Sequence, residues 1–456
     1  MKKLLATLMA LGLALILCSC SLAGTLGGRL QQILDKQTAQ PQQTQEATGV
    51  PETTEAPATP ETPEAPDGGD VSGAENLSGN LAAGGYLAMD AQGALYAARG
   101  GIYKQDAQGL RRICEDSADH LNVCGDRLIY VSVDWEGDEG VSRIVSVDLE
   151  GGDRKVLAGE ARCAYEIDFN DDWTETTVNY LCGYADATVW EGYVYFIADN
   201  DDGTTQRMYN PYSSGNVTVT WNHDKSICRV PVDGGEVEEL VKGLGNGRPS
   251  LAIAQGRIWY STSYESGAFS YPVTTFHSCA LDGSDDQLLY GNGELNAPDA
   301  TREIVMGLFA SDGVLYVSAS DSEGDFPNSR LMCVQNGTYE MMGEETYYVP
   351  TTVDGQGRLY WFVHEGDVLW DEDDGVVVDE YLNNVRLIRT QPGGDTAQCD
   401  ELLRFDRLER FGDDFSTFTV YVLDGKVYAL TQDDVYLVEN GAATEVMDLP
   451  DLNDND

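Results

Sequence analysis

Basic residues are scarce in this sequence. Its 456 residues include 28 Lys and Arg against 77 Asp and Glu, for a formal net charge of −49. Proteins that bind nucleic acid need clusters of Lys and Arg to displace counterions from the phosphates, and the nearest approach to a cluster is the pair Arg111-Arg112. The composition therefore excludes nucleic acid as a partner and offers no basic patch to anionic lipid headgroups. We interpret the acidic charge as the solvated surface of an extracellular monomer.

Catalytic and metal-binding motifs are also missing. The chain has no Gly-x-Ser-x-Gly elbow, no Gly-Lys-Ser/Thr phosphate loop and no Cys-x-x-Cys pair. Its four histidines stand in no metal-ligand pattern; they are His120, His223, His277 and His364. We therefore expect a protein that is not an enzyme and needs no cofactor. A carboxylate-dependent enzyme remains the alternative, because acids are abundant.

The first residues read as an export signal. Lys2 and Lys3 precede an apolar run over 4–17, which is too short to span ~30 Å of hydrocarbon and is typical of a signal peptide. The following Leu17-Cys18-Ser19-Cys20 resembles the bacterial lipobox. The resemblance implies that residues 1–19 are removed and that Cys20 is acylated, which would anchor the protein to the cell membrane outside the cytoplasm. The alternative is an ordinary secretory signal cut nearby.

Large apolar residues are almost absent between 37 and 80. Six prolines alternate there with Thr, Glu, Gln and Ala, and such a segment cannot bury enough surface to offset the entropy of ordering it. We predict a lipidated N-terminal segment over 20–36, a disordered stalk over 37–80, a folded domain over 81–450 and an acidic tail over 451–456.

Helical periodicity is missing from the folded domain, whereas a short strand pattern repeats. Seven segments of four residues share one pattern: Gly or Asp, then any residue, then Leu, Ile or Val, and finally an aromatic residue or Ile. They are 93–96, 126–129, 192–195, 256–259, 313–316, 357–360 and 425–428. Each is followed by a second strand pattern that ends at a Gly turn, and apolar runs flank every pair. Four strands per unit, repeated seven times, predict an all-β fold, a seven-bladed β-propeller. Six or eight blades remain possible on this pattern.

The cysteines of the folded domain number eight and admit two interpretations. An even number in an exported protein permits disulfides, and Cys114 with Cys124 and Cys163 with Cys182 are close enough in sequence to pair. The other cysteines include three at related places of successive repeats, which favours buried thiols; they are Cys228, Cys279 and Cys333.

One pair of strands carries a family resemblance. The segment 127–132, followed by Ile144 and the turn at Gly151, resembles the propellers of low-density-lipoprotein-receptor type and the TolB-like propellers. The Tyr-Trp-Thr-Asp tetrad of the receptor family is missing, and Ile258-Trp259-Tyr260 only approximates it. The resemblance implies the propeller fold found in bacterial lipoproteins of unknown function, and it assigns no functional residue to this sequence.

Candidate binding residues lie in the long connections between second and third strands. In a propeller these connections share one face, and variable loops on a rigid scaffold are where function is expected. The aromatic candidates are Trp135, Tyr209, Tyr212, Trp221, Tyr264, Tyr271 and Trp370. Acidic runs ending in Gly suggest calcium ligands at Asp199, Asp201, Asp371 and Asp373. The alternative is that the rings pack the loops down and that the acids are only solvated.

These features favour a membrane-tethered propeller that binds or scaffolds a glycan, peptide or protein of the cell envelope. Aromatic rings beside carboxylates suit sugar faces, cationic peptides or a partner with a basic patch. A glycan- or peptide-processing enzyme and a structural envelope component remain the alternatives.

Overall fold

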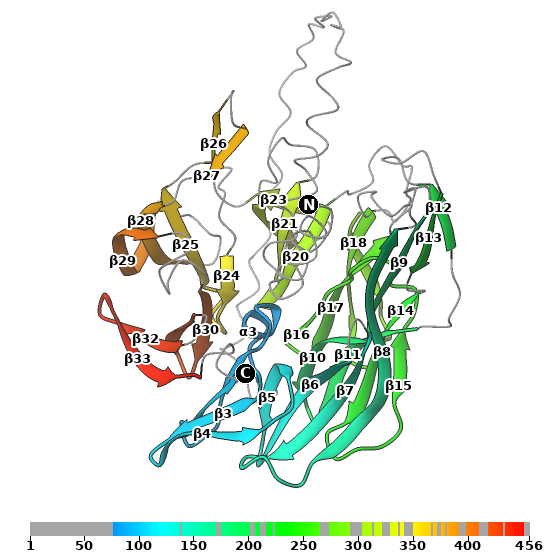
Figure 1. The fold of residues 1–456 in the computed structure, drawn as a ribbon, viewed down its shortest axis with the longest axis horizontal. Helices are drawn as coiled ribbons and strands as arrows, with labels where there is room; N and C mark the ends of the chain where they lie inside the picture. The colour runs from blue at the N-terminus through cyan, green and yellow to red at the C-terminus, as the bar shows by residue number, and fades with distance from the viewer. Residues whose placement is uncertain are drawn as a thin grey trace, which may run out of the picture.

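The computed structural model describes residues 76–450 apart from short internal gaps. The gaps are 137–138, 170–174, 201–205, 210–215, 222–223, 265–272, 292–302, 312–313, 322–328, 336–337, 342–349, 366–367, 372–374, 379–380, 392–397, 410–417 and 432–433. One short helix, α3 (Ser78–Ala82), precedes the strands β1 to β33 (Figure 1). No helix in the described part of the chain is long and apolar enough to cross a membrane.

Seven sets of four antiparallel strands follow one another along the chain, and we number them as blades. Blade 1 has β1 (Leu87–Met89), β2 (Leu95–Ala98), β3 (Ile102–Asp106) and β4 (Gly109–Cys114), and blade 2 has β5 (Ala118–Cys124), β6 (Arg127–Glu136), β7 (Glu139–Asp148) and β8 (Lys155–Phe169). Blade 3 has β10 (Tyr184–Trp190), β11 (Tyr193–Asp199), β14 (Lys225–Pro231) and β15 (Glu238–Val241), and blade 4 has β16 (Leu251–Ala254), β17 (Arg257–Tyr264), β18 (Val273–Ala280) and β19 (Gln287–Tyr290).

The remaining blades repeat this order. Blade 5 has β20 (Glu303–Ser311), β21 (Val314–Asp321), β22 (Ser329–Gln335) and β23 (Thr338–Met341), and blade 6 has β24 (Pro350–Val353), β25 (Leu359–Glu365), β28 (Tyr381–Thr390) and β29 (Cys399–Glu409). Blade 7 has β30 (Thr419–Leu423), β31 (Lys426–Leu430), β32 (Asp434–Glu439) and β33 (Ala442–Asp448). Five further strands are insertions: β9 (Glu175–Cys182), β12 (Gln206–Tyr209), β13 (Asn216–Trp221), β26 (Val368–Asp371) and β27 (Gly375–Val378).

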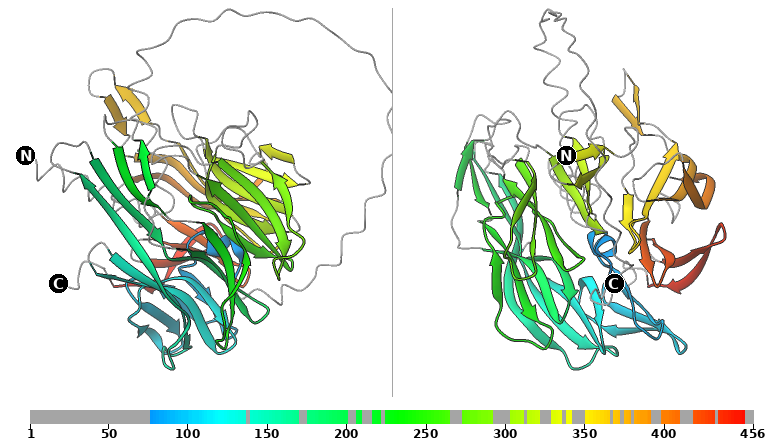
Figure 2. Two further views of the ribbon diagram at one scale, coloured as in Figure 1. Left: turned by 90° about the vertical axis from the view of Figure 1, so that its right-hand side faces the viewer. Right: turned by 180° about the vertical axis from the view of Figure 1, so that it is seen from behind.

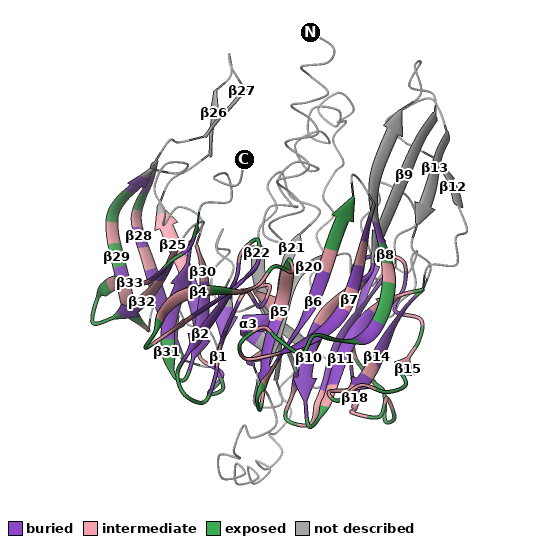
Figure 3. Ribbon diagram, turned by 60° about the horizontal axis from the view of Figure 1, so that its bottom comes forward, coloured by how far each residue is buried: buried purple, intermediate pink, exposed green. Residues whose placement is uncertain are grey.

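The blades close into a ring. The first strand of each blade contacts the first strand of the next, and β30 of blade 7 contacts β1 of blade 1. These inner strands are mostly buried, whereas the outer strands β4 and β15 carry partly exposed and exposed residues (Figure 3). The prediction of a seven-bladed all-β propeller is therefore confirmed.

A turn aspartate explains the repeated strand pattern in blades 1 and 6. The Asp90 carboxylate accepts hydrogen bonds from the backbone N–H of Gln92 and Ala94 (both 2.9 Å) and from the hydroxyl of Tyr96 (2.9 Å). Asp354 does the same in blade 6, where the hydroxyl of Tyr360 donates at 3.0 Å. The Asp side chain thus shapes the turn and fixes the aromatic residue at the end of the pattern.

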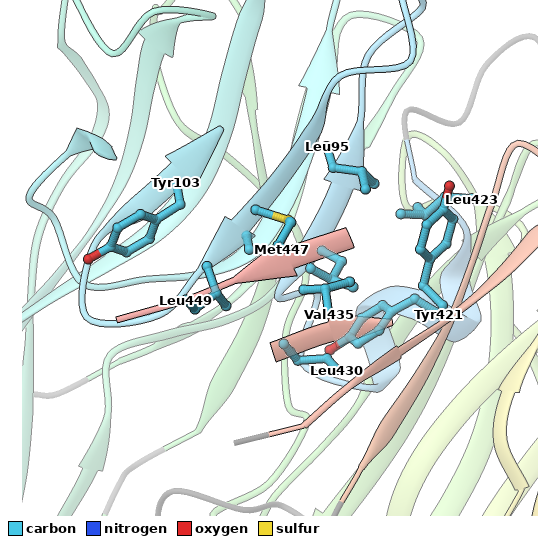
Figure 4. Packing of buried hydrophobic residues seen from close by; sticks show 11 residues of the cluster. Leu95, Tyr103, Tyr421, Leu423, Leu430, Val435, Met447 and Leu449 are labelled. Carbon is cyan, nitrogen blue, oxygen red and sulfur yellow. The ribbon is translucent and has the colours of Figure 1, made fainter. Parts of the chain in front are cut away.

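The ring closes by side-chain packing between its first and last blades. Blade 1 comes wholly from the first strands and blade 7 wholly from the last, so no sheet combines strands from both ends of the chain. Between them lies one hydrophobic cluster (Figure 4), which includes Leu95 and Tyr103 of blade 1 with Tyr421 and Met447 of blade 7. Similar clusters fill the contacts between blades 1 and 2, 2 and 3, and 3 and 4.

Candidate functional site

The extra strands project from one side of the ring, which we call the loop face. Blade 3 inserts β12 and β13 between its second and third strands, and blade 6 inserts β26 and β27 at the same place. Both insertions, together with β9, rise on the same side (Figures 1 and 2). The corresponding connections of blades 1 and 7 are short, so the elaboration of the loop face is uneven around the ring.

The largest elaboration is a sheet extension that we call the wall. It consists of the end of β8 beyond Cys163 together with β9, β13 and β12. Strand β8 pairs antiparallel with β9, β9 pairs parallel with β13, and β13 pairs antiparallel with β12. Because β8 belongs to blade 2 and β13 to the insertion of blade 3, hydrogen bonds join blade 2 and this insertion into one seven-stranded sheet, whereas the four strands of blade 3 form a sheet of their own. The sequence analysis expected four strands in each blade and did not predict this extension.

Trp135 stands at the foot of the wall. It is the register partner of Gly140, which is in turn the partner of Cys163. The side chain is 54% exposed, and its ring lies so close to Gly140 that a Cβ there would come within 2.9 Å of it. An exposed indole backed by glycine offers a flat apolar surface to a ligand.

Ion pairs lie on the opposite face of the same strands. The Arg143 guanidinium donates to the Asp134 carboxylate and to Oε1 of Glu160 (2.7 Å). The hydrogen bond to Glu160 is the largest cause that raises the pKa of Arg143 above its usual range. Because neighbouring residues of a strand point to opposite faces, and Arg143 is the register partner of Ser132 whereas Gly140 is that of Trp135, these ion pairs stabilise the strands behind the indole and do not flank its exposed ring.

The structure places the other aromatic candidates in different surroundings. Tyr264 is partly buried, and its hydroxyl donates to the carbonyl oxygen of Gly243, so it holds down the connection between blades 3 and 4. Tyr209 lies on β12 and Trp221 on β13, both in the wall, whereas Trp370 lies on the separate hairpin of β26 and β27. Tyr212 and Tyr271, together with Cys20, fall outside the described residues.

Two of the calcium candidates lie on described strands. Asp199 ends β11 as the register partner of Lys225, whose buried Nζ donates to the Gly247 carbonyl at 2.8 Å. Asp371 faces Gly375 across the hairpin of β26 and β27; Asp201 and Asp373 lie outside the described residues. No group of three or more His, Cys, Asp or Glu within the described ranges could hold a metal ion.

The protein's own chain fills the axial channel. Helix α3 contacts the inner strands of blades 3 to 7. Just before it, the Asn76 amide donates to the carbonyl oxygens of Leu87 in blade 1 (3.2 Å) and Leu121 in blade 2 (2.9 Å). Asn80 donates to the Val422 carbonyl at 2.7 Å and accepts from its N–H at 2.9 Å. Residues 76–80, which the sequence analysis assigned to the stalk, thus reach all seven blades.

A partly buried histidine, His120, lies between two carboxylates close to residues 76–82. Nδ1 of His120 is 2.7 Å from Oδ1 of Asp119, and Nε2 is 3.6 Å from Oδ1 of Asp186. Burial disfavours the charged ring, but the two carboxylates outweigh it and raise the pKa of His120 to about 10. The ring is therefore an imidazolium at neutral pH, which suits a structural ion pair and not a general base. The backbone N–H of His120 donates to Gly84 (2.9 Å), next to α3.

A second histidine forms a hydroxyl, imidazole and carboxylate series in blade 4. The Thr275 hydroxyl lies 2.8 Å from Nε2 of His277, whose Nδ1 is 3.3 Å from Oδ1 of Asp286. This is the order of a nucleophile, base and acid. However, Thr275 is 3% exposed and also bonds to the Thr262 hydroxyl. The hydroxyl is thus shielded from solvent, and we interpret the series as hydrogen bonds that satisfy buried polar groups within blade 4.

Comparisons with known proteins add a likeness of fold. No family model matches the sequence, and no curated protein matches it. Among solved structures, the β-propeller domain of the Trilobed protease from Pyrococcus furiosus is 12% identical with a TM-score of 0.38, covering 72% of this chain and 83% of its own. An oligogalacturonate lyase from Vibrio parahaemolyticus is 10% identical with a TM-score of 0.39, covering 80% and 90%.

A third similar structure is a polysaccharide lyase described as an ulvan lyase. It is 9% identical with a TM-score of 0.46, covering 84% of this chain and 96% of its own. These structures are named for quite different activities, and the likeness assigns none of those activities to this chain.

Proposed function

We propose that this protein is an extracytoplasmic binding module, tethered to the cell membrane through an acylated Cys20, whose wall binds a glycan, peptide or protein of the cell envelope. The observation that carries the proposal is the contrast between an axis occupied by residues 76–82, which bind the inner strands, and a raised wall with an exposed indole at its foot. Elaborated loops on a rigid scaffold are where recognition is expected, so we place the binding surface on this rim.

The chemistry of the wall's foot narrows the ligand. Trp135 offers a flat ring that suits the apolar face of a sugar or an aliphatic side chain, and this ring lies over Gly140. The net charge of −49 repels polyanions and favours neutral or basic ligands.

The test compares two equally exposed side chains. Trp135 and Leu288 are each 54% exposed, but Leu288 lies on β19, the outer strand of blade 4. Arrays of neutral and amino-sugar envelope glycans and of cationic peptides would first identify a ligand. Trp135→Ala should then weaken its binding about tenfold or more, as truncation of a central aromatic anchor does, and Leu288→Ala should leave it unchanged. Equal affinity of the two variants would overturn the proposed surface.

The tether is tested separately in cells. Cys20→Ala removes the thiol that the acyl chain would occupy, so the variant should move from the membrane fraction to the soluble extracytoplasmic fraction. Cell fractionation with immunoblotting measures this. Retention of the variant in the membrane fraction would show that something other than acylation anchors the protein.

A further inference from the structure

Two cysteines face each other where the wall leaves blade 2. Cys163 of β8 and Cys182, the last residue of β9, are register partners in an antiparallel pair. Residues directly opposite in such a pair have Cα atoms about 4.5 to 5.5 Å apart, and a disulfide spans Cα separations of about 4.4 to 6.8 Å. The backbone therefore sets the two residues at a separation that a disulfide bridges.

The chain next to Cys182 is drawn in tightly against Cys163. Gly183 has φ 66, and a Cβ there would lie 2.6 Å from Sγ of Cys163 and 2.2 Å from Oγ of Ser142. The N–H of Tyr184 donates to the same Ser142 hydroxyl at 2.8 Å. Cys163 itself is 3% exposed. Only glycine fits at 183, so the two strands stay close at the base of the wall.

The other cysteines do not share this arrangement. In the described strand pairs Cys228 faces Phe196 and Glu239, and Cys279 faces Ile258. Cys114 lies beside the Tyr130 hydroxyl, with Sγ to Oη at 3.5 Å, and its register partner is Ile102. Cys124 pairs in register with Arg127. The structure therefore does not support the expected pairing of Cys114 with Cys124, although the two are close in sequence.

We propose that Cys163 and Cys182 form a disulfide that closes the base of the wall. One thiolate attacks the disulfide of a donor, either a thiol–disulfide oxidoreductase or oxidised glutathione, and releases one donor thiol. The second thiolate then attacks the mixed disulfide and releases the other donor thiol. Two protein thiols are oxidised to one disulfide, the donor disulfide is reduced to two thiols, and the two protons end on the donor. In the cell this step rests on the extracytoplasmic location of the proposed function, because such a donor persists there.

The bond would fix the geometry of the proposed binding surface. Residues 164–181 leave blade 2 after Cys163 and return to it at Cys182. Closing this loop covalently prevents β9, and with it β13, from peeling away from β8. Cys163 also shares a transverse row with Gly140 and Trp135, so the linkage lies beside the indole.

Mass spectrometry of the full chain tests the linkage. Purified, fully reduced and refolded protein is incubated with oxidised glutathione, unfolded without reductant, alkylated with N-ethylmaleimide and digested with a protease that cleaves after Glu166 and Glu175. We expect one disulfide-joined peptide pair containing Cys163 and Cys182. Cys228 and Cys279 serve as internal controls. Burial raises their thiol pKa values to about 11 and 12, so in the folded protein they should not react with oxidised glutathione, and after unfolding they should be alkylated. Alkylation of both Cys163 and Cys182 would overturn the proposal.

A second arm separates the linkage from the location. Cells are lysed in N-ethylmaleimide, and the protein is isolated and digested in the same way. A joined pair from cells supports both the linkage and the export of the chain. A pair that forms with oxidised glutathione but is found alkylated in cells keeps the linkage and overturns the extracytoplasmic location.

Discussion

Two partly buried histidines show how neighbouring charges decide the state of the same side chain. For His277, burial is the dominant influence and lowers the pKa, although Asp286 opposes it. For His120, the carboxylates of Asp119 and Asp186 prevail over burial and raise the pKa to about 10. The two rings therefore link folding to pH in opposite directions.

Replacing His120 should flatten the alkaline side of the stability profile. Its folded pKa of about 10 exceeds the unfolded value of about 6.5. Its contribution is thus fully present below about 6.5 and is lost as pH rises towards the folded pKa. We expect the melting temperature of the wild type to fall more steeply from neutral to alkaline pH than that of His120→Gln, as measured by circular dichroism.

His277→Gln is the matched control for that experiment. Protonation of His277 is disfavoured in the folded state, so its effect falls on the acid side, where stability is lost as pH drops through the unfolded pKa. Its alkaline limb should run parallel to that of the wild type. Parallel alkaline limbs for wild type and His120→Gln would contradict the raised pKa of His120.

At the scale of elements, asparagine amides complete the inner strands. The inward edge of each first strand faces the axis, where an unpaired N–H or C=O group is costly. Asn80 pairs with both backbone groups of Val422. Asn122 of β5 does the same across to β10, donating to Ala187 and accepting from Val189, both at 3.2 Å. These side-chain amides thus form the hydrogen bonds that a neighbouring strand would otherwise make with the backbone.

Asn80→Ala should destabilise the whole ring. The variant leaves the buried N–H and C=O of Val422 without their partner, which costs about 1 to 3 kcal/mol for each unsatisfied group. We expect the free energy of unfolding in urea to fall by about 3 kcal/mol on that basis. Asn383→Ala, at an exposed position on β28, should change it by less than about 0.5 kcal/mol. Equal effects of the two variants would show that the hydrogen bonds between Asn80 and Val422 do not stabilise the fold.

Sequence reasoning found the blades because their repeats are local. A turn residue, an alternating strand and an aromatic residue such as Tyr96 or Tyr360 recur within a few positions, and Asp90 and Asp354 explain why. The role of residues 76–80 on the axis was missed because Asn80 forms its hydrogen bonds with Val422, which is far away in the sequence. The sequence offered two signals, Asn80 beside Leu81 and the glycine pair Gly84-Gly85. Both glycines have positive φ in the structure.

The candidate site was only partly predictable for the same reason. The sequence analysis placed Trp135 in a connection, but the residue lies on β6, which extends further than the sequence pattern indicated, and its side chain is 54% exposed there. Strand β9 was missed because its parallel partner β13 comes from the next blade. Tyr264 looks the same as Trp135 in the sequence, but its contact with Gly243 is formed only in the folded protein.

At the scale of the whole molecule, the contact between blades 1 and 7 differs from the others in its chain connection. It is a hydrophobic cluster like those between blades 1 and 2 and between blades 3 and 4, but no chain segment leads directly from blade 7 to blade 1. Met447, 1% exposed, lies in this cluster. This contact should therefore open more readily than the contacts between blades that follow each other in the chain.

Met447→Ala should weaken that contact specifically. Truncating a buried Met costs about 2 to 5 kcal/mol of unfolding free energy, and the increase in amide hydrogen exchange should concentrate in β1 to β4 and β30 to β33. Ile253→Ala, in the cluster between blades 3 and 4, should cost a similar amount while speeding exchange in those blades. If Met447→Ala increased the rate of amide hydrogen exchange equally in all blades, the contact of blades 1 and 7 would not be a separate weak point.

The parallel pairing of β9 with β13 gives the ring an uneven stiffness. Hydrogen bonds tie blade 2 to the insertion of blade 3, whereas no chain segment joins blade 7 directly to blade 1. We therefore expect the ring to deform more easily at the contact of blades 7 and 1 than at the wall. A ligand held on the wall would sit on the part of the molecule that deforms least.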